Sequence, residues 1–137
     1  MRKLLILFAA VCLTTALTAQ SKVSKKEIEK ATNEVAVRYQ LTPEQKAKMT
    51  AIQERRLTNL QEVEKIKSTD YENYLRKRAT VRIATENHIK RMLTDEQTKI
   101  YQAQVAERRK RESEKLKDLK RQGATKEQLE LGLLEIE

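Results

Sequence analysis

The chain has 137 residues, with 29 lysines and arginines against 20 aspartates and glutamates, which gives a net charge of +9. This length allows one domain at most. The two glycines are too few for a phosphate-binding loop, and one histidine with one cysteine leaves almost no ligands for zinc. We therefore expect no enzyme activity, no cofactor and no metal site.

The first nineteen residues have the pattern of a signal peptide, with two basic residues before an apolar run at 4–13 and small residues up to Ala19. We expect cleavage after Ala19, with Ala16 as the alternative, so that residues 20–137 form the mature domain. The apolar run is shorter than the ~20 residues of a membrane span. The sequence thus predicts export without stable membrane insertion after cleavage.

The mature chain has little material for a core. It contains no Phe and no Trp, its aromatic residues are four tyrosines, and leucine, isoleucine and valine make up about a fifth of it. It also has no cysteine, because Cys12 leaves with the leader. Such a chain cannot fill a thick core. We expect thin, extended helices that need a second copy of the chain to cover them.

Five helix starts can be recognised along the mature chain, each with a capping Ser or Thr and a Glu or Gln three residues later. These pairs are Ser24 with Glu27, Thr42 with Gln45, Thr69 with Glu72, Thr94 with Gln97, and Thr125 with Gln128. Gly123 is typical of a helix C-terminus. The predicted helices are 25–40, 43–67, 70–92, 95–121 and 126–136. The predicted fold is all-α, a thin, extended antiparallel hairpin of four to five helices in a single domain.

Arginines interrupt the apolar stripes of the second and third predicted helices, where a purely structural stripe would place leucine or alanine. Full burial of unpaired arginines would be costly, so we expect an open, partly hydrated face that binds other polypeptides. The alternative is that these arginines extend along the stripe edges or pair with glutamates. The candidate binding residues are Met49, Ile52, Arg56, Leu60, Tyr74, Arg78, Arg82 and Met92.

Two further segments carry marked charge or apolar character. The basic run 108–111 could serve nucleic acid, anionic lipid or an acidic protein, but a solvated helix with i,i+4 ion pairs is the favoured interpretation. Export argues against nucleic acid as a physiological partner. The apolar tail from about 126 places Leu129, Leu133 and Ile136 on one side of a short helix. We expect it to cover a groove in the protein, since its surrounding glutamates disfavour lipid.

The sequence Leu-Thr-x-x-Gln occurs twice at a predicted helix start, and a third match at residues 57–61 lies inside a predicted helix and is treated as coincidence. The motif residues are Leu41, Thr42, Gln45, Leu93, Thr94 and Gln97. Two copies in a short, exported, basic and all-helical chain resemble the Spy/CpxP family of periplasmic proteins, over a range from the signal peptide to about Arg121. The apolar tail after Gly123 departs from that family's pattern.

The resemblance implies an ATP-independent chaperone of the periplasm that forms cradle-shaped, antiparallel helical homodimers. It implies that a basic concave face with apolar patches binds unfolded or misfolded client proteins, and that the six motif residues are architectural. Two alternatives stay open. One is an envelope-stress regulatory protein that binds a sensor kinase, and the other is a metal-responsive envelope protein.

Overall fold

A computed structural model describes residues 23–136 of the chain. This range contains five helices and no strand, so the all-α prediction is confirmed. The helices are α1 (Lys25–Tyr39), α2 (Pro43–Glu64), α3 (Tyr71–Met92), α4 (Asp95–Arg121) and α5 (Lys126–Leu134). The predicted boundaries are correct to within three residues, and the largest difference is the earlier end of α2. The predicted signal peptide, residues 1–19, lies outside the described residues.

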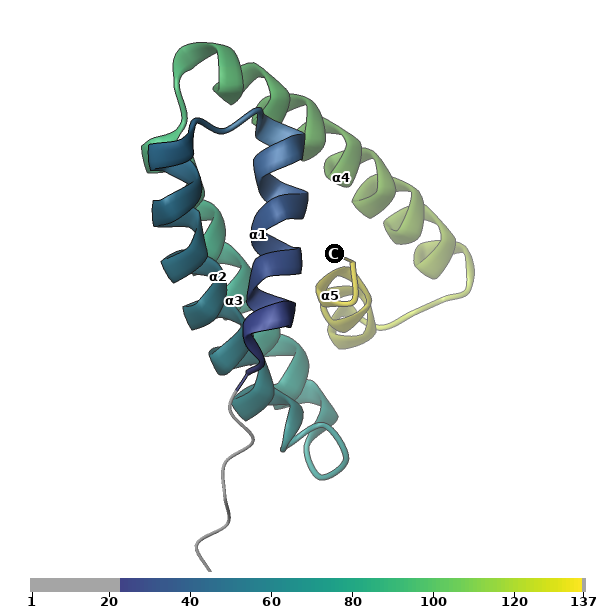
Figure 1. The fold of residues 1–137 in the computed structure, drawn as a ribbon. Coiled ribbons are helices and arrows are strands. Elements are labelled where there is room, and N and C mark those ends of the chain that lie inside the picture. The colour runs from purple at the N-terminus through teal and green to yellow at the C-terminus, as the bar shows by residue number, and fades with distance from the viewer. Residues whose placement is uncertain (1–22, 137) are drawn as a thin grey trace, which may run out of the picture.

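The five helices form a body and an arm (Figure 1). In the body, α2 packs against both α1 and α3, and α2 and α3 form an antiparallel hairpin. The arm consists of α4, which contacts α1 and then runs away from the body, and α5, which turns back and contacts both α4 and α3. The arm therefore bridges from one end of the body towards its other end.

The capping residues explain where four of the helices begin. Ser24, Thr42, Thr94 and Thr125 each accept a hydrogen bond from the backbone N–H three residues later, and the Glu or Gln at that position bonds back to the cap. Each such cap contributes about 1 kcal/mol to helix stability. These four predicted capping boxes are confirmed.

The predicted start of the third helix at Thr69 is wrong by one residue. Asp70 is the cap, because its carboxylate accepts a hydrogen bond from the Asn73 N–H at 3.1 Å. The Thr69 hydroxyl instead donates to the carbonyl of Ile66 at 3.2 Å, within the turn that follows α2. Asp and Thr are both good caps, so the sequence alone does not choose between neighbours.

Two helices end in a left-handed residue. Gly123 has φ of +74° after α4, as its position in the sequence predicts, and Gln40 has φ of +53° after α1. At both sites the next residue donates back into the helix, from Leu41 to Ala36 at 2.9 Å and from Ala124 to Leu119 at 3.1 Å. Gln40 thus occupies a conformation that costs an L-residue about 1 kcal/mol and glycine much less.

We expect Gln40→Gly to raise the free energy of unfolding by about 0.5–1 kcal/mol, because it removes this strain. Gly123→Ala is the matched control and should lower it by about 1 kcal/mol, since an added Cβ there would meet no atom within 4 Å and only backbone strain would act. Urea unfolding measures both changes. A destabilised Gln40→Gly protein would show that the exposed Gln40 side chain contributes more than its backbone costs.

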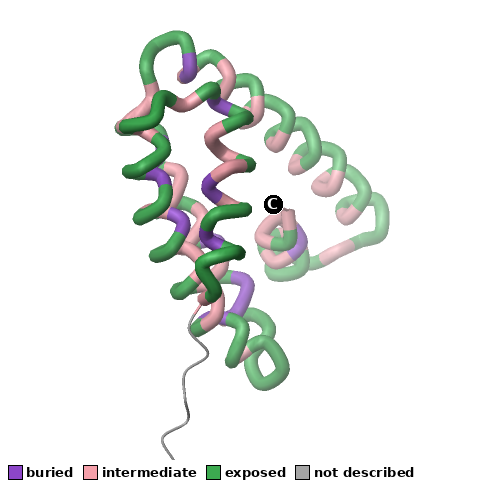
Figure 2. The backbone as a smooth tube through the Cα atoms, in the orientation of Figure 1, coloured by how far each residue is buried: buried purple, intermediate pink, exposed green. Residues whose placement is uncertain are grey.

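The core is divided into two small clusters. The motif-end cluster consists of Tyr39, Met49 and Ile89, and the hairpin-end cluster consists of Val63, Tyr74 and Leu75. Figure 2 shows that most buried residues lie in the body, whereas the arm is mainly exposed or half-buried. The thin core that the composition predicts is therefore present, and it leaves the space between body and arm unfilled.

The apolar tail folds back onto its own chain, as expected. Leu131 and Leu134 of α5 pack against the hairpin-end cluster. The expected stripe of Leu129, Leu133 and Ile136 did not include either of these contact residues. Gly132 is buried because α5 approaches α4 closely there, and a Cβ at this position would lie 2.5 Å from the Leu119 Cδ1 atom.

Candidate functional site

The two Leu-Thr-x-x-Gln motifs lie face to face and are joined by their glutamines. The Gln45 amide donates to Gln97 Oε1 at 2.8 Å, and the Gln97 amide donates to Gln45 Oε1 at 2.9 Å. Each amide nitrogen also donates across to the backbone carbonyl just before the other motif, from Gln45 to Met92 at 2.8 Å and from Gln97 to Gln40 at 3.2 Å. The arrangement is symmetric, and it joins the α1–α2 turn to the α3–α4 turn.

The same glutamines also complete their own capping boxes. Each Oε1 atom accepts the backbone N–H of its own cap, Thr42 or Thr94, at 3.0 Å. A glutamate can perform this capping role, as Glu27 does in α1, but an ionised carboxylate has no N–H to donate across. Glutamine is required because each side chain must accept at its own helix and donate to the other.

The motif leucines complete the joint by apolar packing. Leu41 and Leu93 pack against the motif-end cluster, and so do Met92 and Ile52. The six motif residues cap two helices or join the two turns through contacts within the chain, as an architectural role requires. Their spacing within each motif follows from capping, and their duplication follows from the reciprocal pairing.

We expect Gln97→Glu to lower the free energy of unfolding at pH 7 by about 1–3 kcal/mol, since it removes the donor and places a carboxylate against Gln45 Oε1. Lowering the pH should restore part of the loss, because a protonated carboxyl can donate again. Gln128→Glu is the control, because the α5 capping box has an exposed Gln128 and should change little. Urea unfolding of the wild type and of both variants at two pH values measures these changes. Equal effects of the two substitutions would contradict the pairing.

A concavity of about 570 Å³ lies between the body and the arm, and all five helices or their flanking residues line it. Six arginines and three glutamates contribute to its wall, which leaves three net positive charges. The arginines are Arg38, Arg56, Arg78, Arg82, Arg108 and Arg111, and the glutamates are Glu34, Glu86 and Glu107. Apolar patches from Ala31, Val35, Leu60 and Val105 lie among them. The concavity thus presents cationic and apolar chemistry together.

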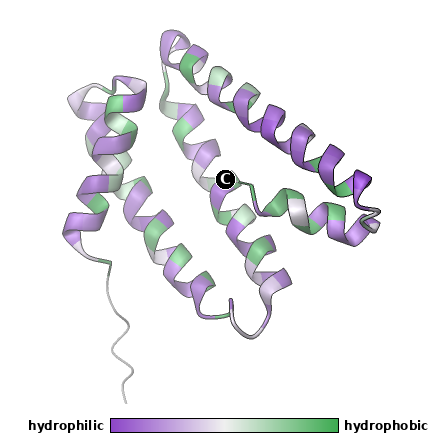
Figure 3. Ribbon diagram, turned by 90° about the vertical axis from the view of Figure 1, so that its right-hand side faces the viewer, coloured by the Kyte–Doolittle hydropathy of each residue, from purple (hydrophilic) through white to green (hydrophobic). Residues whose placement is uncertain are grey.

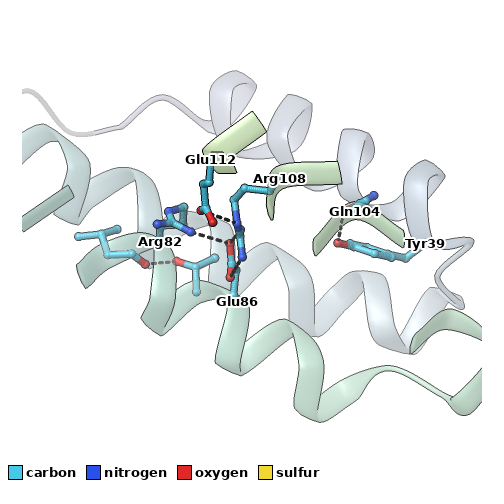
Figure 4. Close-up of polar contacts among 8 residues, drawn as sticks. Tyr39, Arg82, Glu86, Gln104, Arg108 and Glu112 are labelled. Atoms are coloured by element: carbon cyan, nitrogen blue, oxygen red, sulfur yellow. Dashed lines mark hydrogen bonds and ion pairs between the residues drawn. The ribbon is translucent and has the colours of Figure 1, made fainter. Parts of the chain in front are cut away.

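Glu86 neutralises part of this charge and ties α3 to α4 (Figure 4). Arg108 makes a two-pronged contact with the Glu86 carboxylate, with Nη2 3.2 Å from Oε2, and Arg82 Nη1 lies 3.6 Å from Oε1. Arg108 Nε also lies 3.7 Å from Glu112 Oε1. The hydrogen bond to Glu86 raises the pKa of Arg108 above its usual value. The contacts with Glu86 therefore hold the side chains of Arg82 and Arg108 in the concavity wall, where the carboxylate compensates part of their positive charge.

A second link joins the arm to α1 nearby. The Tyr39 hydroxyl donates to Gln104 Oε1 at 2.6 Å (Figure 4). Burial of the ring raises the pKa of Tyr39, so the phenol stays protonated and remains a donor across the physiological range. Together with the Arg108–Glu86 contact, this bond fixes the first half of α4 against the body.

We expect Glu86→Ala to lower the free energy of unfolding by about 1.5–3 kcal/mol, because it removes a charged hydrogen-bond acceptor that two arginines share. The control is Glu72→Ala, which removes an exposed i,i+4 pair with Arg76 and should cost under about 0.5 kcal/mol. Urea unfolding of both variants provides the comparison. Similar small effects would mean that the α3–α4 tie contributes little to the position of the arm.

The concavity brings together four of the eight predicted binding residues. Arg56, Leu60, Arg78 and Arg82 all line it. Arg56 Nη1 lies 3.5 Å from Gln53 Oε1. Arg78 Nη1 lies 3.5 Å from the Tyr74 hydroxyl, and its guanidinium is 5.9 Å from the centre of that ring, within reach of a cation–π interaction.

The other four predicted binding residues lie in the core or beside it. Met49 is fully buried in the motif-end cluster and Tyr74 is 5% exposed in the hairpin-end cluster, so their expected place on an open face is corrected. Ile52 and Met92 are half-buried against the motif-end cluster. The physical reason is that α2 packs against both α1 and α3, and α3 against both α2 and α5, which turns part of each apolar stripe inward.

Sequence reasoning missed six charged residues of the site: Arg38, Arg108, Arg111, Glu34, Glu86 and Glu107. Two of them belong to the basic run 108–111, which was interpreted as a solvated helix face. Arg108 and Arg111 are three positions apart and so share a face, which is the signal that points to a common surface. Arg38 follows Val35 by three positions in the same way, at the edge of the α1 stripe.

Two other kinds of site have no support among residues 23–136. In this range no group of three or more His, Cys, Asp or Glu residues could hold a metal ion. His88 is exposed and its Nδ1 atom bonds to the carbonyl of Ala84 on its own helix. No helix of the same range combines the length and apolar character needed to cross a membrane.

Comparisons with protein families, with curated proteins and with solved structures each gave no match to this chain.

Proposed function

We propose that this protein is an ATP-independent chaperone of the periplasm that binds unfolded or misfolded proteins in the arginine-lined concavity. The observation that carries the proposal is the concavity itself, in which six arginines lie among apolar patches on a frame of capped helices. The resemblance of the two motifs to the Spy/CpxP family supports the same function. The expected signal peptide supports the location.

The chemistry of the concavity suits exposed segments of unfolded chains. The net positive charge of the lining attracts acidic segments over a distance of about 8–10 Å before contact at ordinary salt. Apolar patches then add short-range contacts that do not depend on one side-chain shape. Arginine suits this double role because its stem is apolar and its guanidinium remains charged. Binding is therefore adaptable and weak enough for release.

The size of the concavity limits what it can bind. Pockets of roughly 300–1,000 Å³ accommodate a ligand the size of a small drug molecule. A concavity of about 570 Å³ therefore accommodates a short segment of a client, not a folded domain. A homodimer, as the resemblance implies, would place two such concavities in one assembly and increase avidity for long clients.

A regulatory role is the second candidate, in which the same surface binds an acidic sensor domain of an envelope-stress kinase. A concavity of defined size suits one specific partner better than a broad, flat surface does, and this favours the regulatory candidate. A pull-down with the mature protein separates the two functions. A single saturable partner supports regulation, and many unfolded proteins support the chaperone.

The chaperone proposal predicts that the mature protein suppresses aggregation of a chemically denatured model protein at stoichiometric amounts without ATP. The double variant Arg56→Gln/Arg78→Gln should lose at least half of this protection, because it removes two positive charges from the concavity. Raising the salt concentration should weaken the wild-type protein in the same direction.

The matched control is Arg91→Gln/Arg109→Gln, which removes the same charge at two exposed positions outside the concavity. It should protect as the wild type does. Light scattering during dilution of the denatured model protein measures its aggregation in four samples. These contain the wild type, the wild type at raised salt, and each of the two double variants. Equal loss in both double variants would show that net charge, and not the concavity, is responsible. No protection by the wild type would refute the proposal.

A further inference from the structure

A segment of the same chain, residues 125–136, reaches the edge of the concavity. Leu134, the last residue of α5, and Ile136 just beyond it are part of the concavity wall. Figure 3 shows α5 returning beneath the hydrophilic α4 towards α3, with apolar residues along its length. The segment of residues 125–136 therefore lies where the arm closes on the body.

This segment is acidic, whereas the chain as a whole is strongly basic. Residues 125–137 contain four glutamates, one lysine and five leucines or isoleucines. Its formal charge of −3 contrasts with the three net positive charges of the concavity. An acidic, leucine-rich segment is thus the chemical complement of the concavity, whose edge its residues Leu134 and Ile136 form.

The docked segment makes both apolar and ionic contacts. Leu131 and Leu134 pack against the hairpin-end cluster, and Glu135 Oε2 lies 3.6 Å from Lys115 Nζ on α4. Glu130 is close enough to Arg76 to contribute to the raised pKa of that guanidinium, after the larger effect of Glu72. The segment therefore combines apolar anchors with acidic flanks that lie near basic residues beside the concavity, and only Leu134 and Ile136 reach the concavity wall itself.

The docked segment is short and only partly buried. α5 has nine residues, and isolated helices shorter than about 12–15 residues are marginal in water. Gly132 is its only buried residue, and Leu131 and Leu134 are half-buried. The Lys115–Glu135 pair is more than 40% exposed on both sides, so it contributes little. Docking therefore depends on half-buried apolar contacts and on the close approach of α5 to α4 at Gly132, and not on ion pairs.

We propose that residues 125–136 are an internal competitor for the client site. The site accepts acidic, leucine-rich amphipathic segments of a partner protein, and α5 leaves its position when such a segment binds. This inference rests on the proposed function, because it names the client segment and the regulation of the same concavity. The apparent affinity for clients is then reduced by the fraction of molecules in which α5 is docked.

The experiment measures binding of a fluorescent synthetic peptide, residues 125–137, to the full mature protein by anisotropy. The wild type is compared with Leu131→Ser/Leu134→Ser, which removes the apolar anchors of α5, and with Glu135→Gln, which removes only the ion pair with Lys115. We expect the double serine variant to bind the peptide at least threefold more tightly than the wild type, and Glu135→Gln to show a smaller increase.

Three controls make the result specific. A peptide with lysine in place of all four glutamates should not bind any of the proteins. Arg56→Gln/Arg78→Gln should bind the acidic peptide more weakly than Arg91→Gln/Arg109→Gln does. Circular dichroism should show that the serine variant keeps the helices of the body, and Glu135→Gln supports the same test without changing an apolar contact.

The failure of this inference can be told apart from failure of the chaperone proposal. Equal peptide affinity in the wild type and both α5 variants overturns the inference, even if the wild type suppresses aggregation and Arg56→Gln/Arg78→Gln does not. Tighter peptide binding by the variants supports the inference, even if no aggregation is suppressed. A dimer that becomes monomeric in the serine variant would assign α5 to a second copy of the chain and would also overturn it.

Discussion

The reciprocal amide pair between Gln45 and Gln97 is the interaction on which the arrangement of the helices depends. It joins the turn before α2 to the turn before α4, and so fixes the point from which the arm leaves the body. Tyr39–Gln104 and Glu86–Arg108 then hold the first half of α4. The rest of the arm diverges from the body, and the concavity is the space that this divergence leaves.

The composition explains why the concavity stays unfilled. Residues 20–137 contain no Phe or Trp to occupy it, and six of the long residues that face it are arginines. A guanidinium needs water or a carboxylate, so sealing six of them into an apolar interior would be costly. Glu86 compensates two of the six through direct contacts. Helix capping and two small clusters thus stabilise the fold while a cationic surface remains accessible.

The helices could be predicted well because capping and termination are local. The site could be predicted only in part. Periodicity identifies an apolar face but not its neighbours, so Met49 and Tyr74 were placed on the open surface although they are buried in the two clusters. Arg108 and Arg111 were missed because their partner surface is set by the direction of the arm. That direction follows from the glutamine pair, which is a contact between residues 52 positions apart.

The duplicated motif illustrates the same limit. Two copies indicated a structural role, yet a single sequence does not reveal that one copy is the hydrogen-bond partner of the other. Once the pair is seen, the need for glutamine in both copies follows from donor and acceptor geometry.

The central claim is that an unfolded partner enters the concavity between body and arm. Amide chemical-shift changes in the isotope-labelled mature protein, during titration with a permanently unfolded acidic polypeptide, test it most directly. The account predicts the largest changes at concavity positions such as Ala31, Val81 and Val105. Changes confined to outward-facing positions such as Lys48 and Ala103, or no changes at all, would contradict it.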